Sequence, residues 1–276
     1  MDKEIYKEEF TIGRVIGEAW KIYKRDFSAI FDLVLAVAAG KFLMVVLVVL
    51  FSPFAQTASK EVLQQFAQIL DALIGMVLAM AIAWRVKTGI DGPAANFSES
   101  LTKGCWRWPA AILTDLLKCV FLLAPFALYF ATAATGNVMF LALFFFLLIP
   151  MIVFAVYWFF STYAVLLKNK SGVAALGYSK EVVRGRAGQV FGYALVLGLI
   201  VGFAGVLAVI PLILIEKMIE LVTVYISIPM AFIAKLAIET IDAYYYTALA
   251  VFFINFDATK RPAKKALREF GQLKNK

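Results

Sequence analysis

The sequence predicts an all-α polytopic membrane protein with six transmembrane helices. Of its 276 residues, 63% are hydrophobic, and the mean hydropathy is +0.84, whereas soluble domains are only about 45–50% apolar. A helix needs about 20 apolar residues to cross a bilayer, and the apolar segments here are too long and too uniform for barrel strands. Six segments meet the requirement: Ile30–Phe51, Phe66–Val86, Pro109–Ala131, Val138–Leu167, Val190–Ile215 and Pro229–Phe256.

Lysine and arginine residues collect in alternate connections between these segments. Six precede the first predicted span, four follow the second, five follow the fourth and seven follow the last. The intervening connections hold only Lys60 and Lys217. Because basic residues remain on the cytoplasmic side, we expect both termini in the cytoplasm. The same charges favour anionic lipid headgroups as partners and not nucleic acid, for which the sequence has no aromatic–basic motif.

One plan is repeated along the chain, in units 1–90, 91–167 and 168–256. Each unit is predicted to be a cytoplasmic amphipathic helix followed by a transmembrane hairpin. Three such units entering from one side are typical of a parallel repeat within a single six-span domain. The remaining residues, 257–276, form a basic cytoplasmic tail. In the first unit, apolar residues recur at helical spacing over Phe10–Phe27 and predict a helix lying on the membrane surface.

Proline and glycine residues predict local features of the spans. A short surface helix is expected to begin at Asn96 or Ser98 and to end before Pro109. Gly198 and Gly202 form a small-xxx-small pair, which permits close helix packing. Three prolines inside spans predict kinks, namely Pro125, Pro150 and Pro211.

Aromatic and basic side chains near the predicted surface helices are candidate contacts with lipid headgroups. Tryptophan rings favour the headgroup level, and lysine and arginine attract anionic lipids. The candidates are Trp20, Lys21, Lys24, Arg25, Trp106, Arg107, Trp108, Lys180, Arg184 and Arg186.

Ionisable side chains inside the predicted spans are the main functional signal. Each costs about 2.5–3.5 kcal/mol at the bilayer centre, so these side chains are expected to turn inward and to find partners. Away from the ends of the spans, three positive and four negative groups nearly balance: Lys41, Lys118, Lys235, Asp71, Asp115, Glu239 and Asp242.

One interpretation of these charges is structural, with ion pairs that fix helix packing. Asp115 and Lys118 share a helical face, as do Lys235 and Glu239. Lys41 has no acidic neighbour on its own face and must reach another helix, water or a ligand.

The other interpretation is a polar cavity within the membrane through which ions, protons or an amphiphilic substrate pass. Glu239 and Asp242 lie about one turn apart, and close carboxylates raise the pKa of one of them. These two residues are therefore the candidate proton-binding pair. The function expected from this interpretation is transport or lipid handling. The alternative is a non-catalytic accessory or scaffold subunit that assembles with itself or with a membrane complex.

The sequence lacks the residue sets that catalysis and cofactor binding require. Histidine is absent, which removes the commonest metal ligand and general base. No metalloprotease, nucleophile-elbow or phosphate-loop motif occurs. Cys105 is predicted to lie on the cytoplasmic side and Cys119 within a span, so we expect no disulfide between them. We therefore expect neither an enzyme nor a cofactor.

The segment Ala175–Gly192, A-L-G-Y-S-K-E-V-V-R-G-R-A-G-Q-V-F-G, resembles the A-L-x-x-S-x-x-L-[VT]-[KR]-G-x-x-x-x-x-F-G signature of YciC-like bacterial membrane proteins. It is also similar to the membrane domain attached to some glycerophosphodiester phosphodiesterases. The resemblance extends more loosely to the six spans and to the aromatic-rich segment Tyr244–Asp257 that ends the last span. It implies a bacterial or archaeal cytoplasmic membrane. It does not imply phosphodiesterase activity, because these residues include no soluble catalytic domain.

Overall fold

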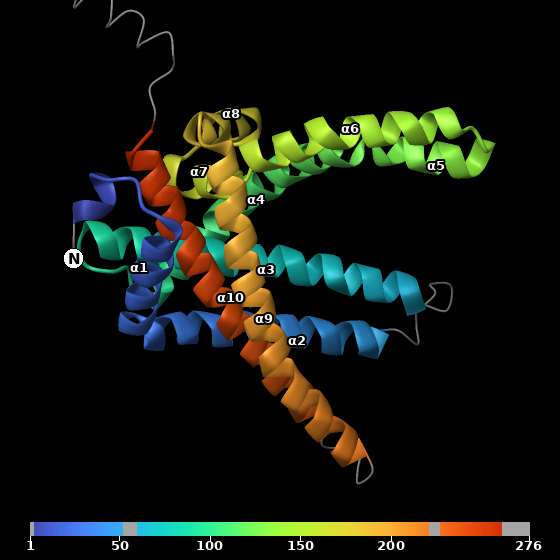
Figure 1. Ribbon diagram of the computed structural model, residues 1–276. Coiled ribbons are helices and arrows are strands. Elements are labelled where there is room, and N and C mark those ends of the chain that lie inside the picture. The colour runs from blue at the N-terminus through green and yellow to red at the C-terminus, as the bar shows by residue number, and fades with distance from the viewer. Residues whose placement is uncertain (1–2, 52–59, 221–226, 261–276) are drawn as a thin grey trace, which may run out of the picture.

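The computed structural model describes residues 3–51, 60–220 and 227–260, and every regular element in them is helical (Figure 1). The elements are η1 (Lys3–Tyr6), α1 (Ile12–Arg25), α2 (Phe27–Phe51), α3 (Lys60–Asp91), α4 (Phe97–Leu123), α5 (Phe126–Thr135), α6 (Val138–Tyr157), α7 (Ser161–Lys168), α8 (Gly172–Val183), α9 (Ala187–Glu220) and α10 (Ser227–Ala258). The tail predicted over 257–276 lies outside the described residues beyond Lys260.

Five helical segments within the described residues are long and apolar enough to cross a membrane unaided. A sixth span results if the bent pair α4 and α5, which meet at 43°, counts as one. The bend falls at Pro125, where the predicted kink is confirmed, because proline cannot donate the next backbone hydrogen bond. Helices α6 and α9 continue through Pro150 and Pro211 without a break. The five segments are Phe27–Met44, Gln65–Asp91, Val138–Lys168, Ala187–Pro211 and Phe232–Ala258.

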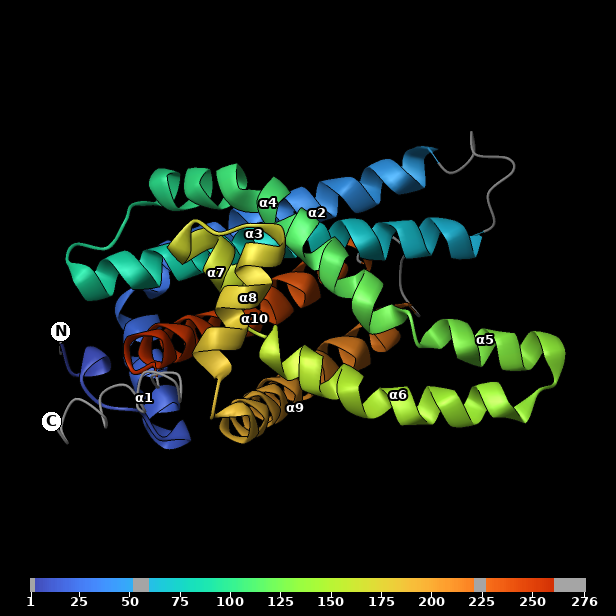
Figure 2. The same ribbon diagram turned by 90° about the horizontal axis from the view of Figure 1, so that it is seen from above.

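The expected end of a short helix before Pro109 is wrong, since α4 runs from Phe97 through this proline to Leu123. Its beginning agrees with the sequence: the Asn96 side chain accepts a hydrogen bond from the Glu99 amide at 2.8 Å and so caps the helix. Gly104, Ala111 and Thr114 form one buried face that continues across Pro109. Packing of this face compensates for the backbone bond that proline removes. Figure 2 shows that α4 changes direction along its length.

The hairpins α2–α3 and α5–α6 project in one direction, and the α9–α10 hairpin projects obliquely away from them (Figures 1 and 2). Helix α10 is the central element and packs against α1, α2, α3 and α9. The aromatic core lies toward its C-terminal end, where Phe160, the residue before α7, packs edge-on against Phe252 with ring centroids 4.9 Å apart. Phe252, Phe253 and Phe256 are all buried there. This core holds the hairpins together at their base.

The apolar face of α1 is covered by protein. Val15 and Ala19 are fully buried, and α1 packs along α10. The Tyr23 hydroxyl donates to the Thr240 carbonyl at 3.0 Å, and burial raises the pKa of Tyr23 to about 12. Trp20 is half exposed beside Tyr23. The helix therefore anchors the N-terminal region to α10, and its other face stays accessible.

Gly104 sets the separation of α3 and α4. A Cβ atom at this position would lie 3.0 Å from the Val77 carbonyl oxygen and 3.2 Å from the Ala81 amide nitrogen. Both are backbone atoms of α3, so neither can rotate away. We expect Gly104→Ala to destabilise the protein by about 1–3 kcal/mol through overpacking. Unfolding in mixed micelles measures the effect.

The control is Gly177→Ala in α8, where an added Cβ meets nothing within 4 Å. This substitution is expected to be neutral, or to stabilise by up to about 1 kcal/mol through helix propensity. Equal losses in the two variants would contradict the proposed contact between α3 and α4.

Candidate intramembrane charged site

Helices α2, α3 and α10 bring ionisable residues to one depth. Lys41 lies 14 residues after Phe27, the start of its apolar segment, or about 21 Å along the helix. Asp71 lies six residues after Gln65, and Glu239 lies seven residues after Phe232. These positions are about 9–11 Å along their helices, counted from the opposite side of the span region. Together these distances match a hydrocarbon core about 30 Å thick. The three side chains can therefore meet inside the span region.

Lys41 forms a buried ion pair with Glu239 across two helices. Its Nζ lies 2.5 Å from Glu239 Oε1 and 3.4 Å from Asp71 Oδ2. Lys41 is 5% exposed and Glu239 is 2% exposed. Lys235 Nζ lies 2.5 Å from Asp71 Oδ1 and 3.6 Å from Glu239 Oε1. Positive and negative groups thus alternate across α2, α3 and α10, and the local pair expected between Lys235 and Glu239 is part of this network.

A cavity of about 450 Å³ lies beside this network, between α2, α3, α4, α7 and α10. Much of its wall is apolar, with Met76 and Phe159 among the contributors, and Thr162, Tyr163 and Tyr246 add hydroxyl groups. Six of the seven predicted ionisable residues line it: Lys41, Asp71, Asp115, Lys235, Glu239 and Asp242. The sequence prediction thus selected residues that the fold brings together.

Lys118 differs from the other six because it is not among the residues that line the cavity. Its Nζ lies 2.6 Å from Asp115 Oδ1, three residues away on α4. This local pair, expected from the helical spacing, neutralises Asp115. Within the described residues, the structure shows no ion pair or hydrogen bond for Asp242.

Gly75 was not part of the predicted site, yet it makes room for the buried lysine. A Cβ atom at Gly75 would lie 3.1 Å from Lys41 Nζ and 3.9 Å from the Tyr246 hydroxyl oxygen. Glycine lets the Lys41 ammonium pass close to the α3 backbone on its way to Glu239. In the sequence, Gly75 is one small residue among several in an apolar run. Only the course of the Lys41 side chain in the structure distinguishes it.

The predicted headgroup contacts divide into exposed and partly or fully buried residues. Trp108 is partly buried, and its indole nitrogen donates to the Leu73 carbonyl at 2.8 Å. It therefore joins α4 to α3. Arg107 is also only partly exposed. The exposed candidates are Trp20, Lys21, Lys24, Arg25, Trp106, Lys180 and Arg184.

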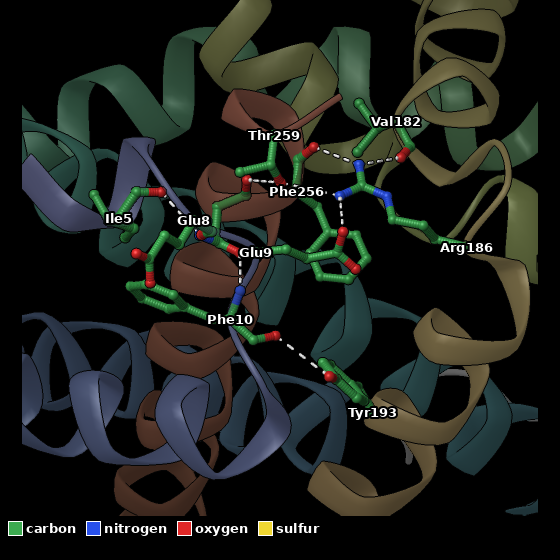
Figure 3. Close-up of polar contacts among 10 residues, drawn as sticks. Ile5, Glu8, Glu9, Phe10, Val182, Arg186, Tyr193, Phe256 and Thr259 are labelled. Atoms are coloured by element: carbon green, nitrogen blue, oxygen red, sulfur yellow. Dashed lines mark hydrogen bonds and ion pairs between the residues drawn. The ribbon is translucent and has the colours of Figure 1, made fainter. Parts of the chain in front are cut away.

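The surface position predicted for Arg186 is wrong, because 0% of its side chain is exposed. Its guanidinium donates to the Phe256 carbonyl at 2.6 Å and the Val182 carbonyl at 2.9 Å (Figure 3). It also donates to Thr259 Oγ1 at 3.0 Å and lies 3.6 Å from Glu9 Oε2. The last carbonyls of a helix lack internal partners and carry partial negative charge. Arg186 therefore caps the C-terminal ends of α8 and α10 together.

Asn255 ties the N-terminal segment to the same end of α10. Its amide nitrogen donates to the carbonyls of Ile5 and Glu8 at 2.8 and 2.7 Å. Its side-chain oxygen accepts from the Phe10 amide at 2.9 Å. Figure 3 shows the N-terminal residues beside the Arg186 contacts. The sequence prediction did not include Asn255, although an asparagine within the apolar and aromatic run 251–256 was an available signal. The structure buries this side chain completely.

A further set of polar contacts joins α7 and α8 to the end of α10. The Tyr178 hydroxyl donates to Asp257 Oδ1 at 2.6 Å, and Lys168 Nζ lies 2.5 Å from Asp257 Oδ2. Burial, followed by the hydrogen bond to Asp257, raises the pKa of Tyr178. These contacts add to the connections that Arg186 and Asn255 make at the base of the hairpins.

The helices and the charged network define a multi-pass membrane protein with ion pairs buried between its helices. No protein family, curated protein or solved structure matches the chain. No group of three or more acidic or cysteine residues suited to a metal ion occurs in the described part of the chain.

Proposed function

We propose that this protein transports or otherwise handles an amphiphilic molecule or ion within the membrane. The supporting observation is the cavity of about 450 Å³ beside the network of Lys41, Asp71, Lys235 and Glu239. Protein interiors normally pack to the density of organic crystals, so ion pairs with a purely structural role need no such space. A cavity with charged groups and an apolar wall suits a ligand that has a polar head and an apolar part.

The cellular setting is part of this proposal. We place the protein in the cytoplasmic membrane of a bacterium or archaeon, with both termini in the cytoplasm and no catalytic role. The arrangement of basic connections supports this orientation, and the resemblance of Ala175–Gly192 to YciC-like proteins supports the membrane. We also propose that units 1–90, 91–167 and 168–256 form a parallel repeat. Helix α1 precedes the α2–α3 hairpin and α8 precedes the α9–α10 hairpin, and in the middle unit the N-terminal part of α4 takes the corresponding place.

The alternative proposal is an accessory or scaffold subunit whose buried charges only fix the packing. The exposed face of α9 favours it. Cβ atoms at Gly198 and Gly202 would meet nothing within 4 Å, so the close packing expected at this pair does not occur within the described chain. A second copy or a membrane partner could approach this face closely.

Flux and lipid scrambling in proteoliposomes separate the two proposals. We expect wild-type activity, and rates at least about tenfold lower in Lys41→Met and Asp242→Asn, because each change alters the charge of the cavity by one. The matched control is Asp32→Asn, which removes an exposed carboxylate of α2 that does not line the cavity. An inactive wild type whose Lys41→Met variant is merely less stable would support the scaffold.

A further inference from the structure

The cavity carries an excess of one negative charge in its resident side chains. Lys41 and Lys235 supply two positive charges, and Asp71, Glu239 and Asp242 supply three negative charges. Asp115 adds nothing to this balance, because Lys118 neutralises it at 2.6 Å. A net charge is costly in a site of low dielectric. One further positive charge would neutralise the cavity.

Two carboxylate groups leave places for that charge. Glu239 is 2% exposed, lines the cavity, and has an Oε2 atom without a hydrogen-bond partner in the described residues. Asp242 also lines the cavity, one turn further along α10, and forms no ion pair in the described part of the chain. The resident lysines are already engaged: Lys41 with Glu239 Oε1 and Lys235 with Asp71 Oδ1.

The size and the wall of the cavity determine the kind of cation. About 450 Å³ is far more space than a bare ion requires. Met76, Phe159 and Leu249 provide apolar surface beside the charged groups, which matches an alkyl chain. The described residues include no group of three acidic or cysteine ligands for a metal. An anionic amphiphile would increase the excess charge, and a zwitterionic headgroup would leave it unchanged.

We propose that the cavity binds a monovalent alkylammonium amphiphile, with its ammonium group at the Asp242 carboxylate, one turn from Glu239, and its chain against the apolar wall. This inference rests on the proposed function and names the chemical class of its substrate. The ammonium group can donate up to three hydrogen bonds, and the carboxylate of Asp242 can accept them. The bound cation leaves the Lys41–Glu239 and Lys235–Asp71 pairs intact.

Hexylammonium is the probe, because it is water-soluble and combines one positive charge with a short chain. The measurement is the unfolding temperature of the protein in phosphatidylcholine nanodiscs as hexylammonium is titrated. We expect a saturable increase, since a ligand that binds only the folded state stabilises it. Hexanol and hexanoate share the chain but lack the positive charge, and they are expected to give no saturable increase.

The variants test the position of the site. Asp242→Asn is expected to weaken hexylammonium binding at least about tenfold, because it removes the carboxylate charge that strengthens the hydrogen bond from the ammonium group. Asp242→Glu keeps the charge and should retain binding, which guards against a folding defect. Asp32→Asn should bind as the wild type does. Equal binding by Asp242→Asn and wild type would overturn the proposal, as would equal effects of hexylammonium and hexanol.

The absence of any saturable effect would also overturn the proposal and would leave a proton as the neutralising charge. The flux assay separates this inference from the proposed function. Saturable hexylammonium binding without flux or scrambling would support the binding site and contradict the proposed transport function. Transport activity that hexylammonium does not inhibit would support the transport function and contradict an alkylammonium substrate.

Discussion

Lys41→Met is expected to destabilise the protein by about 3–5 kcal/mol, the usual cost of breaking one side of a buried ion pair. The substitution leaves Glu239 charged and 2% exposed. Its remaining cationic neighbour is Lys235, whose Nζ lies 3.6 Å away and is already held by Asp71 at 2.5 Å. The measurement is the free energy of unfolding in mixed micelles. Lys21→Met is the control, because Lys21 pairs with Glu18 on an exposed face and such pairs contribute about 0–1 kcal/mol.

A double-mutant cycle tests whether the cost arises from the pair. Adding Glu239→Gln to Lys41→Met removes the uncompensated charge and should recover most of the lost stability. If the two single changes are instead additive, Lys41 and Glu239 do not interact as the structure shows. A stable double variant that has lost transport would show that the two charges are needed for transport. A stable double variant with full activity would assign them to packing.

The spans were predictable because they depend on local composition. Apolar runs of about 20 residues specify helices wherever they lie in the chain, and Pro125 breaks one of them at the predicted position. Pro109 shows the limit of local rules. The face formed by Gly104, Ala111 and Thr114 keeps α4 continuous through this proline, and that packing depends on α3, which is distant from Pro109 in sequence.

The charged site was predictable in its members but only partly in its pairing. The cost of a charge in the bilayer identifies Lys41 and Glu239 without any knowledge of the fold. Their contact joins residues 198 positions apart, which only the tertiary structure can supply. Lys235 and Glu239 share a helical face, so their proximity was visible in the sequence. The cavity itself depends on how five helices meet, and no sequence pattern records it.

Arg186 was assigned to the surface because the sequence cannot distinguish it from Arg184. Both arginines lie in the same basic connection, yet Arg184 is exposed and Arg186 is buried. The difference arises from the ends of α8 and α10, whose carbonyls converge on one guanidinium. A planar group with five donors can serve both ends at once. Burial of this charge is therefore tolerated only where two helix ends meet.

Arg186→Met is accordingly expected to cost about 3–5 kcal/mol, whereas Arg184→Met should change stability by less than about 0.5 kcal/mol. The methionine side chain can still pack on the Phe256 ring, which the guanidinium covers at 4.1 Å. It leaves the carbonyls of Val182 and Phe256 without this donor. The free energy of unfolding in mixed micelles compares the two variants directly.

Arg186→Lys tests the role of geometry in this contact. Lysine keeps the charge but lacks the planar fork, so it should recover less than half of the loss in Arg186→Met. Hydrogen exchange supplies a local readout, because Glu9 lies 3.6 Å from the guanidinium and the neighbouring Phe10 amide is bound by Asn255. Faster exchange at Phe10 in Arg186→Met, but not in Arg184→Met, is expected. Similar stability and exchange in both variants would contradict the buried position of Arg186 and favour the predicted contact with lipid headgroups. Such a result would also mean that Asn255 alone holds the N-terminal segment on α10.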